Sequence, residues 1–243
     1  MEQILGKTIR DLVREDHRAA AVFEKYSIDF CCKGDKPLDT ACTERGVDPL
    51  PVLQELTQLK GTADRERFRP DEWDLDALAD FIVNNHHRYV SRAVPVISAH
   101  VDKVLSVHGK NHPELSDIAA HFHMVADELT HHMYKEENVL FPYIKSLVAA
   151  ARDGRVANAP PFGTIRRPIQ MMESDHRSAG DAISSIRNAS NGFSLPADAC
   201  ETYRVTYREL EDFERDLHQH IHLENNILFP KAIDLEDTLL SYV

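Results

Sequence analysis

The sequence contains few of the residues on which secreted or membrane-embedded folds depend. Only 4 of its 243 residues are cysteine, far too few for a secreted scaffold held together by disulfides. It has no uninterrupted run of about 18 apolar residues, the length that a membrane-spanning helix needs. The first residues also lack the apolar segment of a signal peptide. We therefore expect a cytoplasmic protein that does not enter a membrane.

Basic residues are also scarce. The chain has 28 Lys and Arg against 40 Asp and Glu, which gives a formal net charge of -12. Proteins that bind nucleic acids or anionic membrane surfaces normally need a surplus of Lys and Arg to meet phosphates, so we expect neither partner. With 42% apolar residues, the chain can bury a core without disulfides. Its length fits one large or two small domains.

Histidine, in contrast, is abundant. The chain has 14 histidines, and all but His17 lie between His86 and His222. A local excess of imidazoles in an acidic protein indicates metal binding before any other role.

The spacing of apolar residues predicts an all-α protein in two parts. Residues 1–60 show short helical patterns broken by turns, and we interpret them as a small helical domain that carries adjacent cysteines. Residues 61–70 are polar, lack periodicity and have a helix breaker at each end, as expected for a linker. Residues 71–243 show four long amphipathic patterns with short connections, which indicates an antiparallel four-helix bundle. We expect Ser194 to cap the fourth helix, with Pro196 in its first turn.

An internal repeat lies within the predicted bundle. Residues 132–142 and 220–230 both read His-x3-Glu-x-Asn-x-Leu-Phe-Pro, at an offset of 88 residues. A weaker echo is the His-Arg pair that begins at His87 in the first helix and at His176 in the third. We therefore interpret the bundle as two copies of one helical hairpin, each supplying one histidine from its first helix and a His-x3-Glu pair from its second.

The repeated residues have the chemistry of a metal site. Side chains four residues apart lie on the same face of a helix, and apolar stripes around these residues indicate that the face points inward. Ionisable groups on such a face need partners. The predicted ligands are four imidazoles and two carboxylates: His87, His132, Glu136, His176, His220 and Glu224. An N/O donor set without thiolate, with carboxylates that can bridge, favours a non-haem di-iron centre with an oxo or hydroxo bridge and one position open for a diatomic molecule.

Two further assignments concern residues next to the predicted ligands. His86 is the rival of His87, which we prefer because it shares the apolar stripe of the first helix. Glu128 and Asp216 each precede a ligand histidine by four residues. They can orient the imidazoles or relay protons, or they can belong to a solvated helix face. We expect the remaining histidines to be exposed, hydrogen-bonded or incidental.

The motifs make the sequence similar to a known family. Residues 29–32, 133–142, 172–176 and 223–230 resemble the RIC family, whose name stands for repair of iron centres. The resemblance covers almost the whole chain. It implies a hemerythrin-like di-iron bundle, after a small cysteine-bearing domain, that repairs iron-sulfur clusters damaged by nitric oxide or oxidative stress. Damaged iron-sulfur proteins would be its partners and nitric oxide or oxygen its small ligands, and a homodimer remains open.

The resemblance also bears on Cys31 and Cys32. On the family's pattern they serve in cluster transfer or thiol exchange, and the alternative is two ordinary thiols in a turn. We expect neither thiol to belong to the ligand set. The sequence does not separate iron donation from nitric oxide chemistry. The rival functions are a hemerythrin-like carrier or sensor of oxygen or nitric oxide, and a di-iron oxidase or peroxidase.

Overall fold

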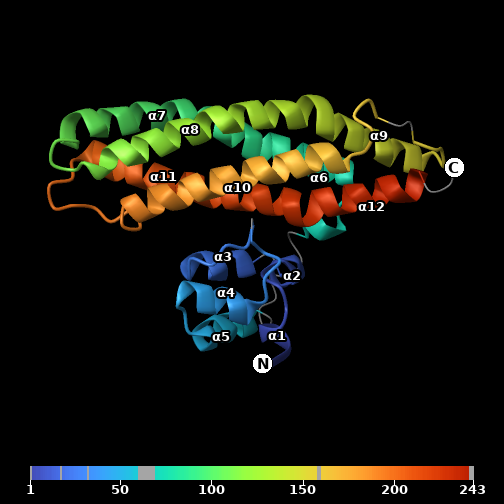
Figure 1. Ribbon diagram of the computed structural model, residues 1–243, viewed down its shortest axis with the longest axis horizontal. Helices are drawn as coiled ribbons and strands as arrows, with labels where there is room; N and C mark the ends of the chain where they lie inside the picture. Colours follow the sequence, from blue (N-terminus) through green and yellow to red (C-terminus); the bar gives the residue numbers. More distant parts are fainter. Residues whose placement is uncertain (1, 17, 32, 60–68, 158–159, 241–243) are drawn as a thin grey trace.

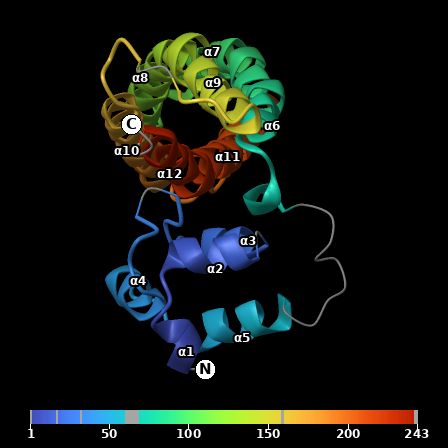
Figure 2. The ribbon, with the colours of Figure 1, turned by 90° about the vertical axis from the view of Figure 1, so that its right-hand side faces the viewer.

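The computed structural model describes residues 2–16, 18–31, 33–59, 69–157 and 160–240, and among these residues it contains helices and no β-strand. Four long helical rods run side by side, and a smaller group of short helices packs against one flank of them (Figure 1). The view along the rods shows them arranged around a common axis (Figure 2). The prediction of an all-α four-helix bundle with a small helical unit before it is therefore confirmed. None of the described helices is both long and apolar enough to cross a membrane.

Most of the four rods consist of more than one helical element. The first contains α6 (Leu75–Ile82) and α7 (Arg88–His108), the second α8 (Glu114–Lys135) and α9 (Phe141–Arg152), the third α10 (Arg166–Ala189), and the fourth α11 (Glu201–Leu223) and α12 (Phe229–Leu240). Helix α8 packs against α7 and α10, and α11 packs against α7.

A π-helical turn joins the two elements of each interrupted rod. These turns are Val83–His87, Glu136–Leu140 and Glu224–Leu228. Pro142 and Pro230 lie in the first turn of α9 and α12, directly after two of them, and neither proline ends its rod. Single π-turns inside α-helices occur frequently at functional sites. All three turns contain predicted metal ligands.

The fourth rod begins later than predicted. Ser194 does not cap it, because its hydroxyl donates to the carbonyl of Asn191. The chain first turns through Asn191 and Phe193, which have φ values of 50° and 60°. Helix α11 then starts at Glu201, with Cys200 at the N-cap position.

In the described residues, the small unit contains five short helices, and a 3-10 turn comes before the bundle. They are α1 (Glu2–Leu5), α2 (Ile9–Glu15), α3 (Ala19–Lys25), α4 (Leu38–Arg45), α5 (Pro49–Leu59) and the turn Pro70–Glu72. The Thr8 hydroxyl accepts from the backbone N–H of Asp11 and caps α2. Most of the predicted linker 61–70 lies outside the described residues, as does Cys32.

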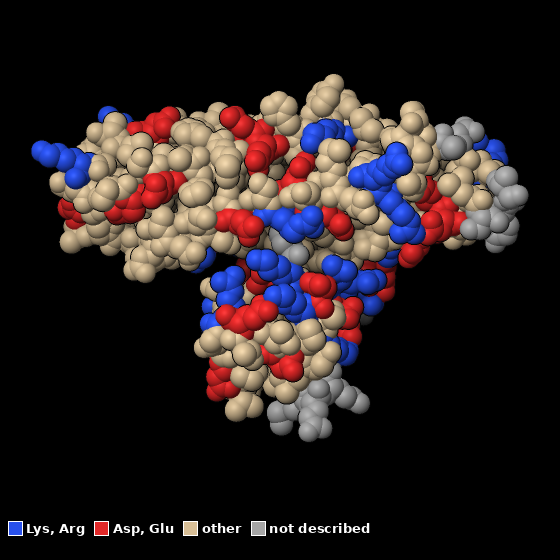
Figure 3. Space-filling model, viewed as in Figure 1, with Lys and Arg blue, Asp and Glu red and all other residues tan. Residues whose placement is uncertain are grey.

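Two apolar clusters form the core. One fills the half of the bundle around α7 and the start of α8 and continues into the small unit, where it includes Phe23 and Phe30. The other fills the opposite half, around α6, α9 and α12. The predicted ligands lie along each rod between the two clusters. Charged side chains gather where the small unit meets the bundle (Figure 3), and Lys33 pairs there with Asp181 at 3.7 Å.

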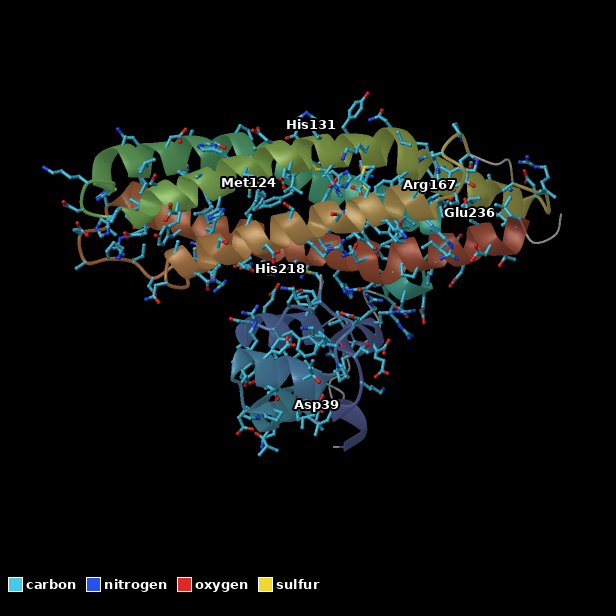
Figure 4. The ribbon with its side chains drawn as sticks, viewed as in Figure 1. Asp39, Met124, His131, Arg167, His218 and Glu236 are labelled. Carbon is cyan, nitrogen blue, oxygen red and sulfur yellow. The ribbon has the colours of Figure 1, made fainter. Side chains whose placement is uncertain are left out.

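Glu236 fixes the rod that carries His176. Its buried carboxylate on α12 accepts from the hydroxyls of Tyr143 and Thr164, at 2.8 and 2.7 Å, and from the backbone N–H of Ile165 at 3.0 Å. The label in Figure 4 shows its place near the end of the bundle. The carboxylate thus satisfies an N–H group at the start of α10 and holds that helix against its neighbours.

Candidate metal centre

The π-turns set the register of the ligand pairs. His132 lies in the last turn of α8, and Glu136 opens the π-turn that follows it. His220 and Glu224 have the same relation at the end of α11. Within each pair the spacing of four residues places both side chains on the inward face. His87 ends the π-turn of the first rod.

The structure brings all six predicted ligands together. They form two groups that share both glutamates: His87, Glu136, His220 and Glu224 in one, and His132, Glu136, His176 and Glu224 in the other. In each group, one donor atom from every residue lies within 4.8 Å of the others. Each of the six residues is fully buried, with at most 1% of its surface exposed.

The histidines form two pairs, and the carboxylates lie between them. His87 Nε2 lies 3.1 Å from His220 Nε2, and His132 Nε2 lies 2.9 Å from His176 Nε2. Glu224 faces both pairs, because its Oε1 lies 3.0 Å from His220 Nε2 and its Oε2 lies 3.1 Å from His176 Nε2. Each pair of ring nitrogens therefore has a carboxylate oxygen beside it.

Glu136 faces both pairs with a single oxygen. Its Oε2 lies 3.2 Å from His132 Nε2 and 3.4 Å from His87 Nε2. Neither of its oxygens makes a hydrogen bond with the described residues, and the same is true of Glu224 Oε2. Buried carboxylate oxygens of this kind are costly unless a cation or a proton compensates them.

The pKa values of the cluster residues reflect this requirement for a compensating charge. Burial opposes protonation of His87, but the adjacent carboxylates of Glu136 and Glu224 outweigh it and raise its pKa to about 10. Burial likewise opposes protonation of His132, but Glu136 raises its pKa to about 9. Burial favours protonation of both glutamates, and at Glu136 the nearby Glu224 carboxylate adds to this, yet the neighbouring imidazoles lower the pKa of both. The cluster thus favours positive charge on His87 and His132 beside the two carboxylates.

Polar groups orient three of the four imidazole rings. His87 Nδ1 lies 2.8 Å from Glu137 Oε1, and His176 Nδ1 lies 2.8 Å from Asn225 Oδ1. His132 Nδ1 lies 3.3 Å from Asp175 Oδ2. Because these oxygens only accept, each ring must donate through Nδ1 and present Nε2 to the centre of the bundle. Among the described residues, His220 Nδ1 has no hydrogen-bond partner.

Glu128 and Asp216, the candidates that the sequence offered for this orienting role, bond to other residues. Glu128 accepts from the hydroxyl of Ser178 at 3.0 Å, and Asp216 lies 2.9 Å from His86 Nδ1. Neither contacts a predicted ligand through these bonds. The sequence did contain a signal for the groups observed: Glu137 and Asn225 each follow the glutamate of the repeat by one residue.

Comparisons with known proteins agree with the two-part architecture. Residues 78–232 match the family model described as the hemerythrin HHE cation binding domain. Residues 5–60 match ScdA_N, a domain of unknown function. The first match covers more than half of the chain.

Whole proteins of similar sequence combine both parts. The iron-sulfur cluster repair protein YtfE of Enterobacter sp. (strain 638) is 33% identical over 226 residues, which are 92% of this chain and 94% of that protein. YtfE of Musicola paradisiaca (strain Ech703) is 33% identical over 93% of this chain and 96% of its own. The iron-sulfur cluster repair protein ScdA of Staphylococcus haemolyticus (strain JCSC1435) is 29% identical over 92% of this chain and 96% of its own.

The chain belongs to this family of iron-sulfur cluster repair proteins. The resemblance inferred from the sequence motifs is thereby confirmed. The family's cation-binding domain spans all six buried residues of the cluster.

His86, the alternative to His87 as a ligand in this repair protein, lies beside the six predicted ligands. Its ring stacks on His220, with 5.7 Å between centroids and an interplanar angle of 12°. His86 also lines a cavity of about 650 Å³ between the small unit and the bundle, together with Arg14, Arg69 and His222. His87 alone of the adjacent pair contributes to the groups of potential donors. The geometry thus favours His87.

Cys31 lies closer to the cluster than the sequence indicated. Cys31 is buried, and its thiol donates to Asp29 Oδ1 at 3.4 Å. Its backbone carbonyl accepts from the side-chain amide of Asn225 at 3.4 Å, and that amide also contacts His176. The small unit thus reaches the residues that surround the cluster. The role predicted for Cys31 and Cys32 stays a prediction.

Proposed function

We propose that this protein repairs iron-sulfur clusters damaged by nitric oxide or oxidative stress, and that it does so with a non-haem di-iron centre. The proposed ligands are His87, His132, Glu136, His176, His220 and Glu224. The observation that carries the proposal is the pair of four-donor groups that share two buried carboxylates. The names of the similar proteins, iron-sulfur cluster repair protein, support the cellular role.

The donor set fits two metal ions. A metal ion about 2.1 Å from each nitrogen and oxygen ligand leaves neighbouring donors about 3 Å apart. The donor pairs described above are separated by 2.9 to 3.4 Å. Glu136 Oε2 and Glu224 Oε2, which have no hydrogen-bond partner among the described residues, both face ring nitrogens. Nitrogen and oxygen donors without sulfur suit iron in a bundle core.

The side chains of this protein would perform three tasks at such a centre. The four imidazoles would bind through Nε2, and Glu136 and Glu224 would join the two metal positions. Glu137, Asp175 and Asn225 would hold three of the rings in place. The apolar clusters on either side would exclude water from the metal-facing atoms. A di-iron centre would supply redox-active iron for reaction with nitric oxide and a source of iron for a damaged cluster.

Recovery of a damaged client enzyme tests this function. The iron-loaded protein is incubated without oxygen with an iron-sulfur enzyme whose cluster nitric oxide has damaged, and the activity of that enzyme is followed. We expect recovery with the unaltered protein and none with Glu224→Ala. Glu114→Ala is the matched control, because Glu114 contacts His112 far from the cluster. Equal recovery with iron-depleted Glu224→Ala would refute a role for the metal site.

A further inference from the structure

Two consecutive asparagines join the predicted metal site to the small unit. Asn225 accepts through Oδ1 from His176 Nδ1 at 2.8 Å and donates through Nδ2 to the carbonyl of Cys31 at 3.4 Å. Asn226 donates through Nδ2 to the carbonyl of Phe30 at 3.1 Å and to His222 Nδ1 at 2.8 Å. Both asparagines are buried. A single amide group therefore lies between a metal-facing imidazole and the backbone of the small unit.

On the small unit, this contact is made by two buried residues. Phe30 and Cys31 are buried, with 1% and 3% of their surfaces exposed. The Phe30 ring packs edge-on against His218 and His222, with centroid distances of 5.9 and 5.7 Å. His218 lies on the side of the bundle that faces the small unit (Figure 4). The backbone at Phe30 and Cys31 is thus a docking segment, and we use this name for these two residues.

The first copy of the repeat shows what is specific to Asn225. The matching residue there is Glu137, whose carboxylate orients His87 and can only accept hydrogen bonds. Its side chain is 41% exposed to solvent. Asn138, the match of Asn226, is exposed and donates to the carbonyl of Tyr134 in its own rod. Only the copy that faces the small unit combines an acceptor for the ligand ring with a donor for the docking segment.

We propose that Asn225 is a positioning residue that couples attachment of the docking segment to the orientation of His176. This proposal rests on metal binding as proposed above. A metal ion on Nε2 of His176 would draw electron density from the ring and make Nδ1–H a stronger donor, and this would hold Oδ1 of Asn225 more firmly toward the ring than without metal. The amide nitrogen then points to Cys31. By thermodynamic reciprocity, metal binding strengthens docking and docking strengthens metal binding.

The rate at which the Cys31 thiol is alkylated tests the coupling. In a Cys32→Ser, Cys200→Ser background, the two remaining thiols are Cys31, at the docking segment, and Cys42, which is buried inside the small unit. We expect iron loading to slow alkylation of Cys31 about fivefold, the effect of about one hydrogen bond. Alkylation of Cys42 should not change with iron loading, because it reports unfolding of the small unit.

Variants of the asparagines separate the two bonds. Asn225→Asp keeps an acceptor for His176 but loses the donor to Cys31, so we expect it to bind iron while the effect of iron on Cys31 disappears. Asn225→Ala loses both bonds, so it should also release iron about tenfold faster. Asn138→Ala, the matched control in the other copy, should behave as the background protein does.

The outcomes distinguish this proposal from the metal site itself. Iron-dependent slowing that persists in both Asn225→Asp and Asn225→Ala would overturn the coupling. Absence of slowing in a background protein with two bound irons would overturn it as well. Failure of the background protein to bind iron would instead overturn the proposed metal site.

Discussion

Replacing His86 by asparagine should make a metal ion beside His220 harder to remove. The reason is a difference between the two copies of the hairpin. Asp175, one residue before His176, supports His132 through Nδ1 at 3.3 Å. The matching position in the first copy is His86, which stacks on His220 without bonding to it, and His220 Nδ1 has no hydrogen-bond partner among the described residues.

An asparagine at this position can supply the missing bond. Its Oδ1 can accept from His220 Nδ1, while its Nδ2 donates to Asp216, the present partner of His86. Aspartate would be a poorer choice, because it would place a second carboxylate beside Asp216. One neutral hydrogen bond contributes about 1 kcal/mol net. We therefore expect His86→Asn to retain one of two iron ions about fivefold more tightly.

Competition with a chelator under anaerobic conditions measures this retention. The release of iron should have two phases, and His86→Asn should slow one of them. His86→Ala is the control, because it removes the stacked ring without adding an acceptor, and it should not slow either phase. Asp175→Ala should speed the other phase. The reasoning fails if His86→Asn and His86→Ala release iron with the same kinetics, or if one substitution slows both phases equally.

The other predictions concern the proposed metal ligands, the metal-free protein, and Glu24 at the junction between the small unit and the bundle. Metal analysis should show that Glu136→Ala and Glu224→Ala each lose most of the two irons expected per chain. Glu114→Ala should keep both irons. Equal loss of iron in all three variants would contradict the ligand assignment. Removal of metal should lower the melting temperature, because buried donors then face an apolar core without a cation, and identical melting of both forms would count against a buried site. Burial raises the pKa of Glu24 from 4.5 to about 7, so the folded state holds the extra proton and the free energy of unfolding should fall as pH rises from about 4.5 to 7. Glu24→Gln should flatten this part of the curve in denaturant titrations, and an unchanged slope would show that Glu24 does not cause it.

The parts of the molecule that were predictable are those specified within one helix. Four apolar stripes and a repeated motif were enough to predict the bundle and the six buried donors. His132 and Glu136 lie four residues apart, so helical geometry alone places them together. The choice of His87 over His86 depended on one apolar stripe, and the donor groups of the structure favour the same residue.

The orienting groups were not predictable in the same way, because they come from neighbouring rods. Glu128 and Asp216 were chosen by their spacing along the helix of a ligand. Asp175 instead reaches His132 from α10. Which residue of one rod faces a ring on another depends on the rotation of each rod about its axis, which apolar periodicity determines only coarsely. The contact between Asn225 and Cys31 spans 194 residues and also lacks a local signal.

The π-turns show where the two copies of the hairpin agree and where they differ. A π-turn contains one residue more than the α-helical turn it replaces. The turns Glu136–Leu140 and Glu224–Leu228 occupy the same register of the two copies, so each copy carries its extra residue directly at its predicted glutamate ligand. The turn Val83–His87 has no counterpart in the described third rod, which is α-helical from Arg166 to Ala189. Among the described residues, the two halves of the bundle therefore agree in their second rods and differ in their first.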